Sequence, residues 1–167
     1  MDEPRQEAVE ELERRDARRP PRFRPPFVAL ALVLAAWAAD WAWGAPRVVP
    51  WPWAWLGVVL IAAGVGLAAW ALRLFVRMGT THDPRERPTR LVTTGPYRVT
   101  RNPMYVAVTT VLLGIGVLVG SWPFLVLPPI GFVLLVSLFF IRREERILER
   151  AFGAEYDEFR RRVRRWL

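Results

Sequence analysis

The chain contains no cysteine and no lysine, and its single histidine is His82. The absence of cysteine excludes disulfides, thiolate nucleophiles and cysteine-ligated metals. One histidine is too few for a histidine-based metal cluster, and it makes a Ser-His-Asp triad a poor interpretation. We therefore expect that the function of this protein does not use a metal.

Hydrophobic residues make up 53% of the 167 residues and charged residues 24%, and the two kinds fall into separate blocks. The net charge of +8 could indicate a nucleic-acid partner. The arginines flank the apolar blocks, however, which is typical of a membrane protein, so we expect no nucleic acid. The first apolar block begins near Phe27, after a long charged stretch. This position argues against a cleaved signal peptide.

The apolar blocks predict an all-α integral membrane protein with about four transmembrane helices. The expected spans cover residues 27–43, 53–76, 104–120 and 124–141. Small residues in the second span, among them Gly57, Gly64 and Gly66, favour close packing against another helix. Pro128 and Pro129 are expected to kink the fourth span, because proline frees backbone carbonyls inside a helix.

The charge pattern predicts the organisation and the orientation of the chain. We divide it into a charged segment (1–26), a two-span membrane hairpin (27–76) and a core that holds the remaining spans (77–167). Arginines crowd the first segment, the loop 77–101 and the tail, whereas the two short turns contain only Arg47. The positive-inside rule therefore places both termini in the cytoplasm, with the protein in the inner membrane.

A polar cluster precedes the third span. Within nine residues it contains Tyr97, Arg98, Arg101, Asn102 and Tyr105. Gly95 and Pro96 predict a tight turn before the cluster, and Pro103 suits the first turn of a helix. The start of that helix can present backbone N–H groups to a carboxylate or a heterocycle.

A carboxylate pair, Glu144 and Glu145, follows the fourth span. The pair could bind a cationic ligand or pair with Arg98 or Arg101. Alternating charges on such a helix are more often a solvated face, and spacing alone favours that interpretation. The short turn between the third and fourth spans nevertheless predicts that their cytoplasmic ends lie side by side, so that the two clusters meet.

A second amphipathic stretch ends the chain. Its apolar residues are Tyr156, Phe159, Val163 and Trp166, set among arginines. This pattern predicts a cytoplasmic helix lying on an anionic membrane surface.

These motifs resemble the isoprenylcysteine carboxyl methyltransferase family and its bacterial relatives, which include phospholipid methyltransferases. The family pattern is Arg-(His or Asn)-Pro-x-Tyr, then Glu-Glu, then Phe-Gly-x-x-Tyr-x-x-Tyr/Phe. The chain has these elements in order at residues 101–105, 144–145 and 152–159. The resemblance covers about residues 77–167, and the first two spans match only as generic membrane helices. Asn102 replaces a common histidine, and Ala107 replaces a common glycine whose loss could narrow the approach of a cofactor.

The resemblance implies a membrane methyltransferase that uses S-adenosylmethionine (SAM), with its SAM-binding core in residues 77–167. The acceptor would be lipophilic or small, such as a prenylcysteine-like carboxylate, a lipid amine, a thiol or an isoprenoid, methylated beside membrane lipid at the cytoplasmic face. The resemblance implies catalytic roles for Arg101, Asn102 and Glu145. It implies cofactor contacts from Tyr97, Arg98, Asn102, Pro103, Tyr105, Glu144 and Glu145. An NADPH-dependent reductase similar to sterol reductases and a catalytically silent membrane adaptor are the alternatives.

Overall fold

The computed structural model describes residues 24–77, 79 and 90–167. Its helices are α2 (Pro25–Trp43), α3 (Trp51–Arg77), α4 (Pro103–Val119), α5 (Trp122–Leu135), α6 (Arg142–Phe152) and α7 (Ala154–Arg162). A short 3-10 helix, η1 (Gly95–Arg98), precedes α4, and a π-helical segment, η2 (Val136–Ile141), joins α5 to α6. No strand occurs in these residues, only two isolated bridges. The predictions for residues 1–23, for His82 and for most of the central loop lie outside the described residues.

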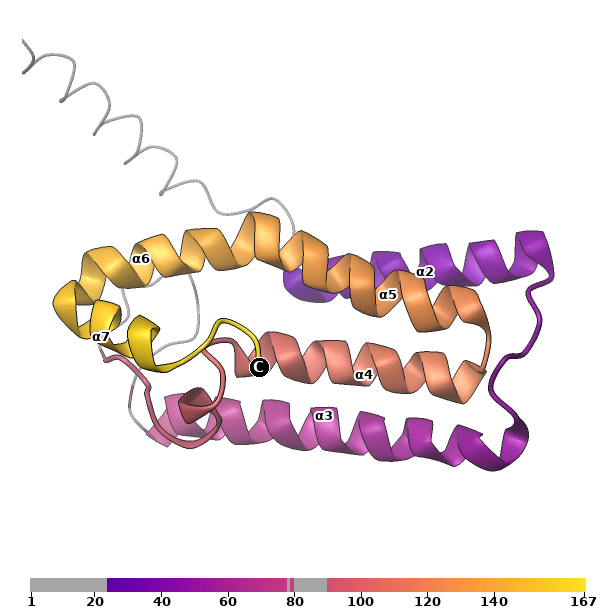
Figure 1. The fold of residues 1–167 in the computed structure, drawn as a ribbon, viewed down its shortest axis with the longest axis horizontal. Helices are drawn as coiled ribbons and strands as arrows, with labels where there is room; N and C mark the ends of the chain where they lie inside the picture. The colour runs from indigo at the N-terminus through magenta and orange to yellow at the C-terminus, as the bar shows by residue number, and fades with distance from the viewer. Residues whose placement is uncertain (1–23, 78, 80–89) are drawn as a thin grey trace, which may run out of the picture.

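The long helices lie side by side in a bundle (Figure 1). Three are long and apolar enough to cross a bilayer: α2, α3 and the continuous helix Trp122–Phe152. The 17 residues of α4 are apolar and extend about 25 Å at 1.5 Å per residue, slightly less than the hydrocarbon core. The predicted all-α membrane fold is confirmed, and each expected span is a helix.

The fourth span remains helical through Pro128 and Pro129, both of which are buried. The helix departs from α geometry only later, in η2. A proline frees the carbonyl four residues before it, so this pair does not account for a π segment that follows it. The strongly charged α6 continues beyond η2, and we therefore take residues 122–141 as the membrane-spanning part.

The close contact between α3 and α4 depends on small residues that repeat every seven positions. A methyl group at Gly57 would lie 2.5 Å from the carbonyl oxygen of Gly114. A methyl group at Gly64 would lie 2.7 Å from the carbonyl oxygen of Ala107. The predicted close packing therefore holds at Gly57 and Gly64, whereas a methyl group at Gly66 would meet nothing within 4 Å. Larger residues on this stripe would push the helices apart.

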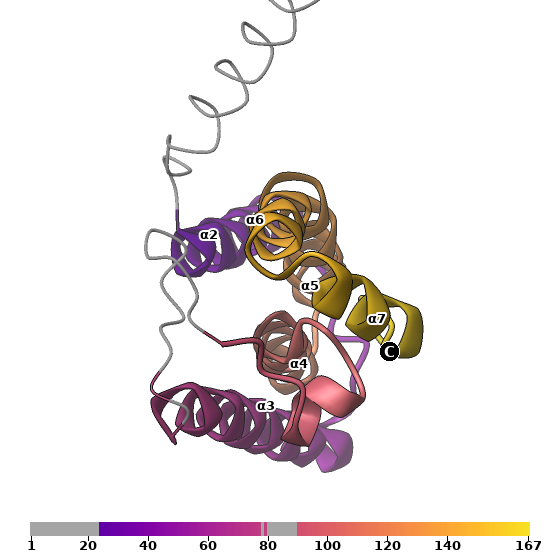
Figure 2. The ribbon, with the colours of Figure 1, turned by 90° about the vertical axis from the view of Figure 1, so that its left-hand side faces the viewer.

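The first two spans pack mainly with later helices rather than with each other. Helix α2 packs against α5, and α3 packs against α4. Leu32 of α2, for example, lies 2.9 Å from where a methyl group on Gly131 would be. Figure 2 shows α4 between α3 on one side and α2 with α5 on the other. A short loop fixes only that two helices are antiparallel, whereas side-chain contacts decide which helices are neighbours. The division of the chain into 1–26, 27–76 and 77–167 stays a prediction.

The apolar side of α7 is packed against the rest of the protein, whereas most of its other residues are exposed. Tyr156 is 1% exposed and Phe159 is 4% exposed, in a cluster with Val92 and Tyr97. Trp166 packs against a second cluster, which contains Tyr105. The prediction that these apolar side chains face a membrane was wrong. They contact residues of η1 and α4 instead, because burial in the protein removes their apolar surface from water.

Candidate active site

The two polar clusters meet at the end of the bundle where α4 begins and α6 leaves it. The Tyr105 hydroxyl donates a hydrogen bond of 2.6 Å to Glu144 Oε1. Arg101 NH1 lies 3.0 Å from Glu145 Oε1. This contact follows from the topology, because α4 begins at the level where the antiparallel helix α5–α6 leaves the bundle (Figure 1). The predicted approach of the two segments is confirmed.

Glu145 is held by two arginines. Arg165 donates from Nε to Oε1 at 3.0 Å and from NH2 to Oε2 at 2.6 Å, so the pair is bidentate. The Glu145 and Arg101 side chains are 15% and 10% exposed, whereas the Arg165 side chain is 39% exposed. Sequence reasoning missed Arg165, because it ends an arginine-rich run in which no local signal distinguishes it.

Glu144 has a different environment from its neighbour. Its hydrogen bond to Tyr105 uses Oε1, and no donor from the described part of the chain reaches Oε2. Burial raises the pKa of Glu144 to about 7, although the Tyr105 hydroxyl and the charge of Arg143 oppose this shift. Near neutral pH this carboxyl group can therefore hold or release a proton.

Arg101 also has a hydrogen-bond donor that is not used within the described residues. Its NH1 group donates to the Tyr156 hydroxyl at 3.2 Å as well as contacting Glu145. Its Nε is buried and has no hydrogen-bond partner among the described residues. A buried donor without a partner costs free energy, so this atom is a candidate ligand contact.

Three other predicted site residues make contacts that stabilise the fold. Asn102 caps no backbone group of α4, and its Nδ2 instead donates to the carbonyl oxygen of Arg165 at 2.9 Å. Tyr97 is 7% exposed and packs edge-on against Phe75, and burial raises its pKa. Pro103 is buried at the start of α4. Their roles toward a cofactor stay predictions.

Two further residues lie outside the network of Arg101, Glu144 and Glu145. Arg98 is exposed and, within the described residues, forms no ion pair or hydrogen bond with the network. Ala107 is 1% exposed, and its carbonyl oxygen faces Gly64 of α3. The methyl group of Ala107 is therefore buried within the helix bundle, close to the contact with α3.

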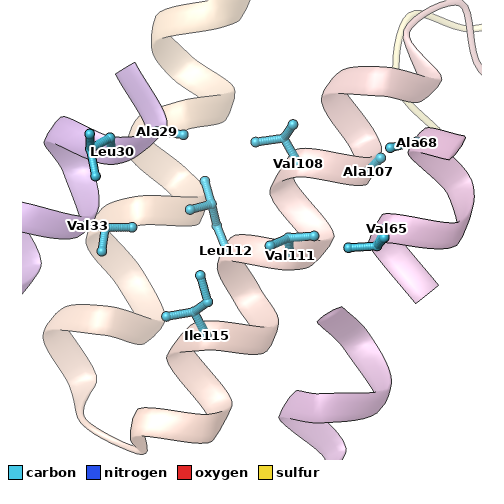
Figure 3. Close-up of a pocket in the computed structure, with 11 residues that line it drawn as sticks. Ala29, Leu30, Val33, Val65, Ala68, Ala107, Val108, Val111, Leu112 and Ile115 are labelled. Carbon is cyan, nitrogen blue, oxygen red and sulfur yellow. The ribbon is translucent and has the colours of Figure 1, made fainter. Parts of the chain in front are cut away.

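An apolar groove of about 420 Å³ lies between α2, α3 and α4. Figure 3 shows side chains of the three helices converging on it. The lining residues are Ala29, Leu30, Val33, Gly64, Val65, Ala68, Ala107, Val108, Val111, Leu112 and Ile115. Val108 and Leu112 also belong to or pack against the cluster that contains Tyr105. One wall of the groove is thus shared with the packing around the polar site.

Comparison with known proteins gives the family. Residues 53–155 match the model of the phospholipid methyltransferase family, which is more than half of the chain. The chain therefore belongs to this family, and membership supports a membrane methyltransferase. The match begins in α3, so our expectation that the resemblance starts near residue 77 was too narrow. The match ends at residue 155, whereas we expected the resemblance to continue to residue 167.

Two curated proteins are similar to parts of the chain. The nickel-cobalt-cadmium resistance protein NccN of Alcaligenes xylosoxydans xylosoxydans is 30% identical over 120 residues, which is 68% of this chain. The chain spans about half of that protein, 52% of its length. An uncharacterized protein of Haemophilus influenzae is 39% identical over 67 residues, 38% of this chain and the whole of that protein. No solved structure matches.

Proposed function

We propose that this member of the phospholipid methyltransferase family is a SAM-dependent methyltransferase that acts on a lipophilic acceptor at the cytoplasmic face of the inner membrane. The observation that carries the proposal is the polar network at the bundle end. This network contains the Tyr105–Glu144 hydrogen bond and the Arg101–Glu145 ion pair. The apolar cluster that includes Tyr105 also contributes side chains to the lining of the groove.

The donor set fits SAM. Arg101 has a buried Nε without a partner in the described chain, which suits a carboxylate of the cofactor. Glu144 has an unengaged oxygen, which suits an ammonium or ribose hydroxyls. Two arginines contact Glu145, so one positive charge of this pair of arginines is not balanced by Glu145 itself. When bound, SAM supplies an electrophilic methyl group.

The groove suits the hydrocarbon part of an acceptor. Its lining is apolar, and Leu30 and Val65 are 55% and 57% exposed toward the surroundings of the bundle. A hydrocarbon chain entering from the bilayer would contact side chains that also pack around Tyr105. The head of the acceptor would then lie at the membrane boundary, and methyl transfer requires it about 3–3.5 Å from the methyl carbon.

Isothermal calorimetry on the purified full chain in detergent tests the cofactor. We expect binding of SAM or its demethylated product without added metal. If NADPH binds and neither SAM nor its demethylated product does, the reductase interpretation would replace the proposal. Lipid profiling of a deletion strain, complemented with the parent or with Glu144→Gln, would then identify the acceptor class.

A further inference from the structure

The strap, which we define as residues 163–167, is bound to the start of α4. Helix α7 ends at Arg162, and Val163 is extended, with φ −122° and ψ 131°. The Arg164 carbonyl accepts a hydrogen bond of 2.9 Å from the backbone N–H of Arg101. The Arg165 carbonyl accepts from the Thr100 hydroxyl at 3.0 Å and from Asn102 Nδ2 at 2.9 Å. Two adjacent carbonyls thus satisfy three donors of residues 100–102.

The strap also binds α6. The Arg165 guanidinium forms its bidentate pair with Glu145, and the next residue, Trp166, packs against the cluster around Tyr105. The strap therefore connects both halves of the candidate site, which come from segments about 40 residues apart in the sequence. Arg165 makes both connections: its carbonyl oxygen binds residues 100 and 102, and its guanidinium binds Glu145.

The bidentate pair constrains the carboxylate. Both oxygens of Glu145 are engaged, and Oε1 is shared between Arg165 Nε and Arg101 NH1. A planar guanidinium bound through two parallel hydrogen bonds fixes orientation as well as charge. Arg101 and Glu145 are largely buried, so the geometry of one follows that of the other.

We propose that Arg165 is a positioning residue of the active site, holding Glu145 and through it Arg101, so that Glu144 is the carboxylate left open to a cationic ligand group. The inference rests on the proposed function. It also assigns a role to a residue outside the part of the chain that matches the family model, residues 53–155.

SAM binding by variants of the full chain tests the positioning role. Arg165→Gln should weaken binding about tenfold, because Glu145 loses its bidentate, charge-assisted contact and with it a fixed orientation. Arg165→Lys should recover part of the affinity, because an ammonium restores the charge but not the two-pronged geometry. Arg164→Gln is the matched control, because it removes the same charge from the neighbouring residue, whose side chain is exposed. This variant should bind SAM like the parent.

A spin label gives a readout that does not depend on SAM. The chain has no cysteine, so Leu167→Cys, at a residue 72% exposed, provides a single attachment site next to Trp166. The label should be immobilised in the parent background and mobile with Arg165→Gln. No change in mobility would overturn the docking of the strap through Glu145.

The outcomes separate the two proposals. If the parent binds neither SAM nor its product, the proposed function fails, and the mobility of the label alone decides whether Arg165 docks the strap. If the parent binds SAM and Arg165→Gln binds it equally, the positioning role is overturned. Equal losses in Arg164→Gln and Arg165→Gln, without recovery in Arg165→Lys, would also overturn it, because they indicate a general effect of charge.

Discussion

The two ends of the α4–α5 hairpin are closed by different chemistry. At the end with the short turn, Arg47 NH1 donates to the Val119 carbonyl at 2.7 Å, and the N–H of Val48 donates to the Gly120 carbonyl at 2.7 Å. Trp43 and Trp122 stack there with ring centroids 5.7 Å apart. Backbone hydrogen bonds and ring stacking thus close this end.

The opposite end, where α4 begins and α6 leaves the bundle, carries ionisable groups in a partly buried network. Arg101, Arg165 and Glu145 form ion pairs, and Tyr105 binds Glu144. Taking such charges from water costs free energy that apolar packing would not cost. The same pair of helices therefore has one end that completes the fold and one end whose polar groups suit a ligand.

The orientation of the two ends gives the largest expected effect, because labelling is all or none. We expect the turn end outside the cell and the ionic end in the cytoplasm, from the distribution of arginines. Ala45→Cys should react with an impermeant thiol reagent in intact cells, whereas Leu167→Cys should react only after lysis. The reverse pattern would place the proposed site on the wrong side of the membrane for cytoplasmic SAM.

The next effect separates the two neighbouring carboxylates. Glu144→Gln should weaken SAM binding roughly ten- to a hundredfold, the usual range for a charge-assisted contact, with little change in melting temperature. Glu145→Gln should instead lower the melting temperature clearly, because it leaves two arginines without their shared partner.

Glu158→Gln is the control, since its exposed ion pair with Arg162 should contribute little to either measurement. Unchanged SAM affinity in Glu144→Gln would remove this residue from the proposed cofactor site.

The pH dependence of binding is a smaller effect at the same end. A carboxyl group with a pKa of about 7 is mostly protonated at pH 6 and mostly ionised at pH 8. The ionised form attracts a cationic ligand group, so SAM affinity should fall about fivefold from pH 7 to pH 6. Calorimetry across this range should show a slope that Glu144→Gln loses. An identical slope in that variant would assign the titration to another group.

The smallest effect is expected at the turn end. Arg47→Ala removes one hydrogen bond of an exposed side chain to a carbonyl, so unfolding should become easier by at most about 1 kcal/mol. SAM affinity should stay at the parent value, because Arg47 lies at the end opposite the candidate site. A clear loss of affinity would mean that the two ends are coupled.

The sequence alone determined the membrane class, the apolar helices and the motif residues of the candidate site. Apolar blocks of spanning length predict membrane helices directly, because the bilayer imposes that length on each helix separately. Arg101, Tyr105, Glu144 and Glu145 could be found in the same way, since each stands in a short motif. Their meeting followed from the short turn between α4 and α5.

Only the tertiary structure decided which helices are neighbours and how the charges pair. Local patterns do not show that α2 packs against α5, or that Tyr156 and Phe159 are buried against η1 rather than laid on a membrane. They also do not distinguish Arg165 from the arginines around it. Each of these outcomes depends on contacts between distant segments, and the free energy of such a contact is fixed by burial and geometry that exist only after the chain has folded.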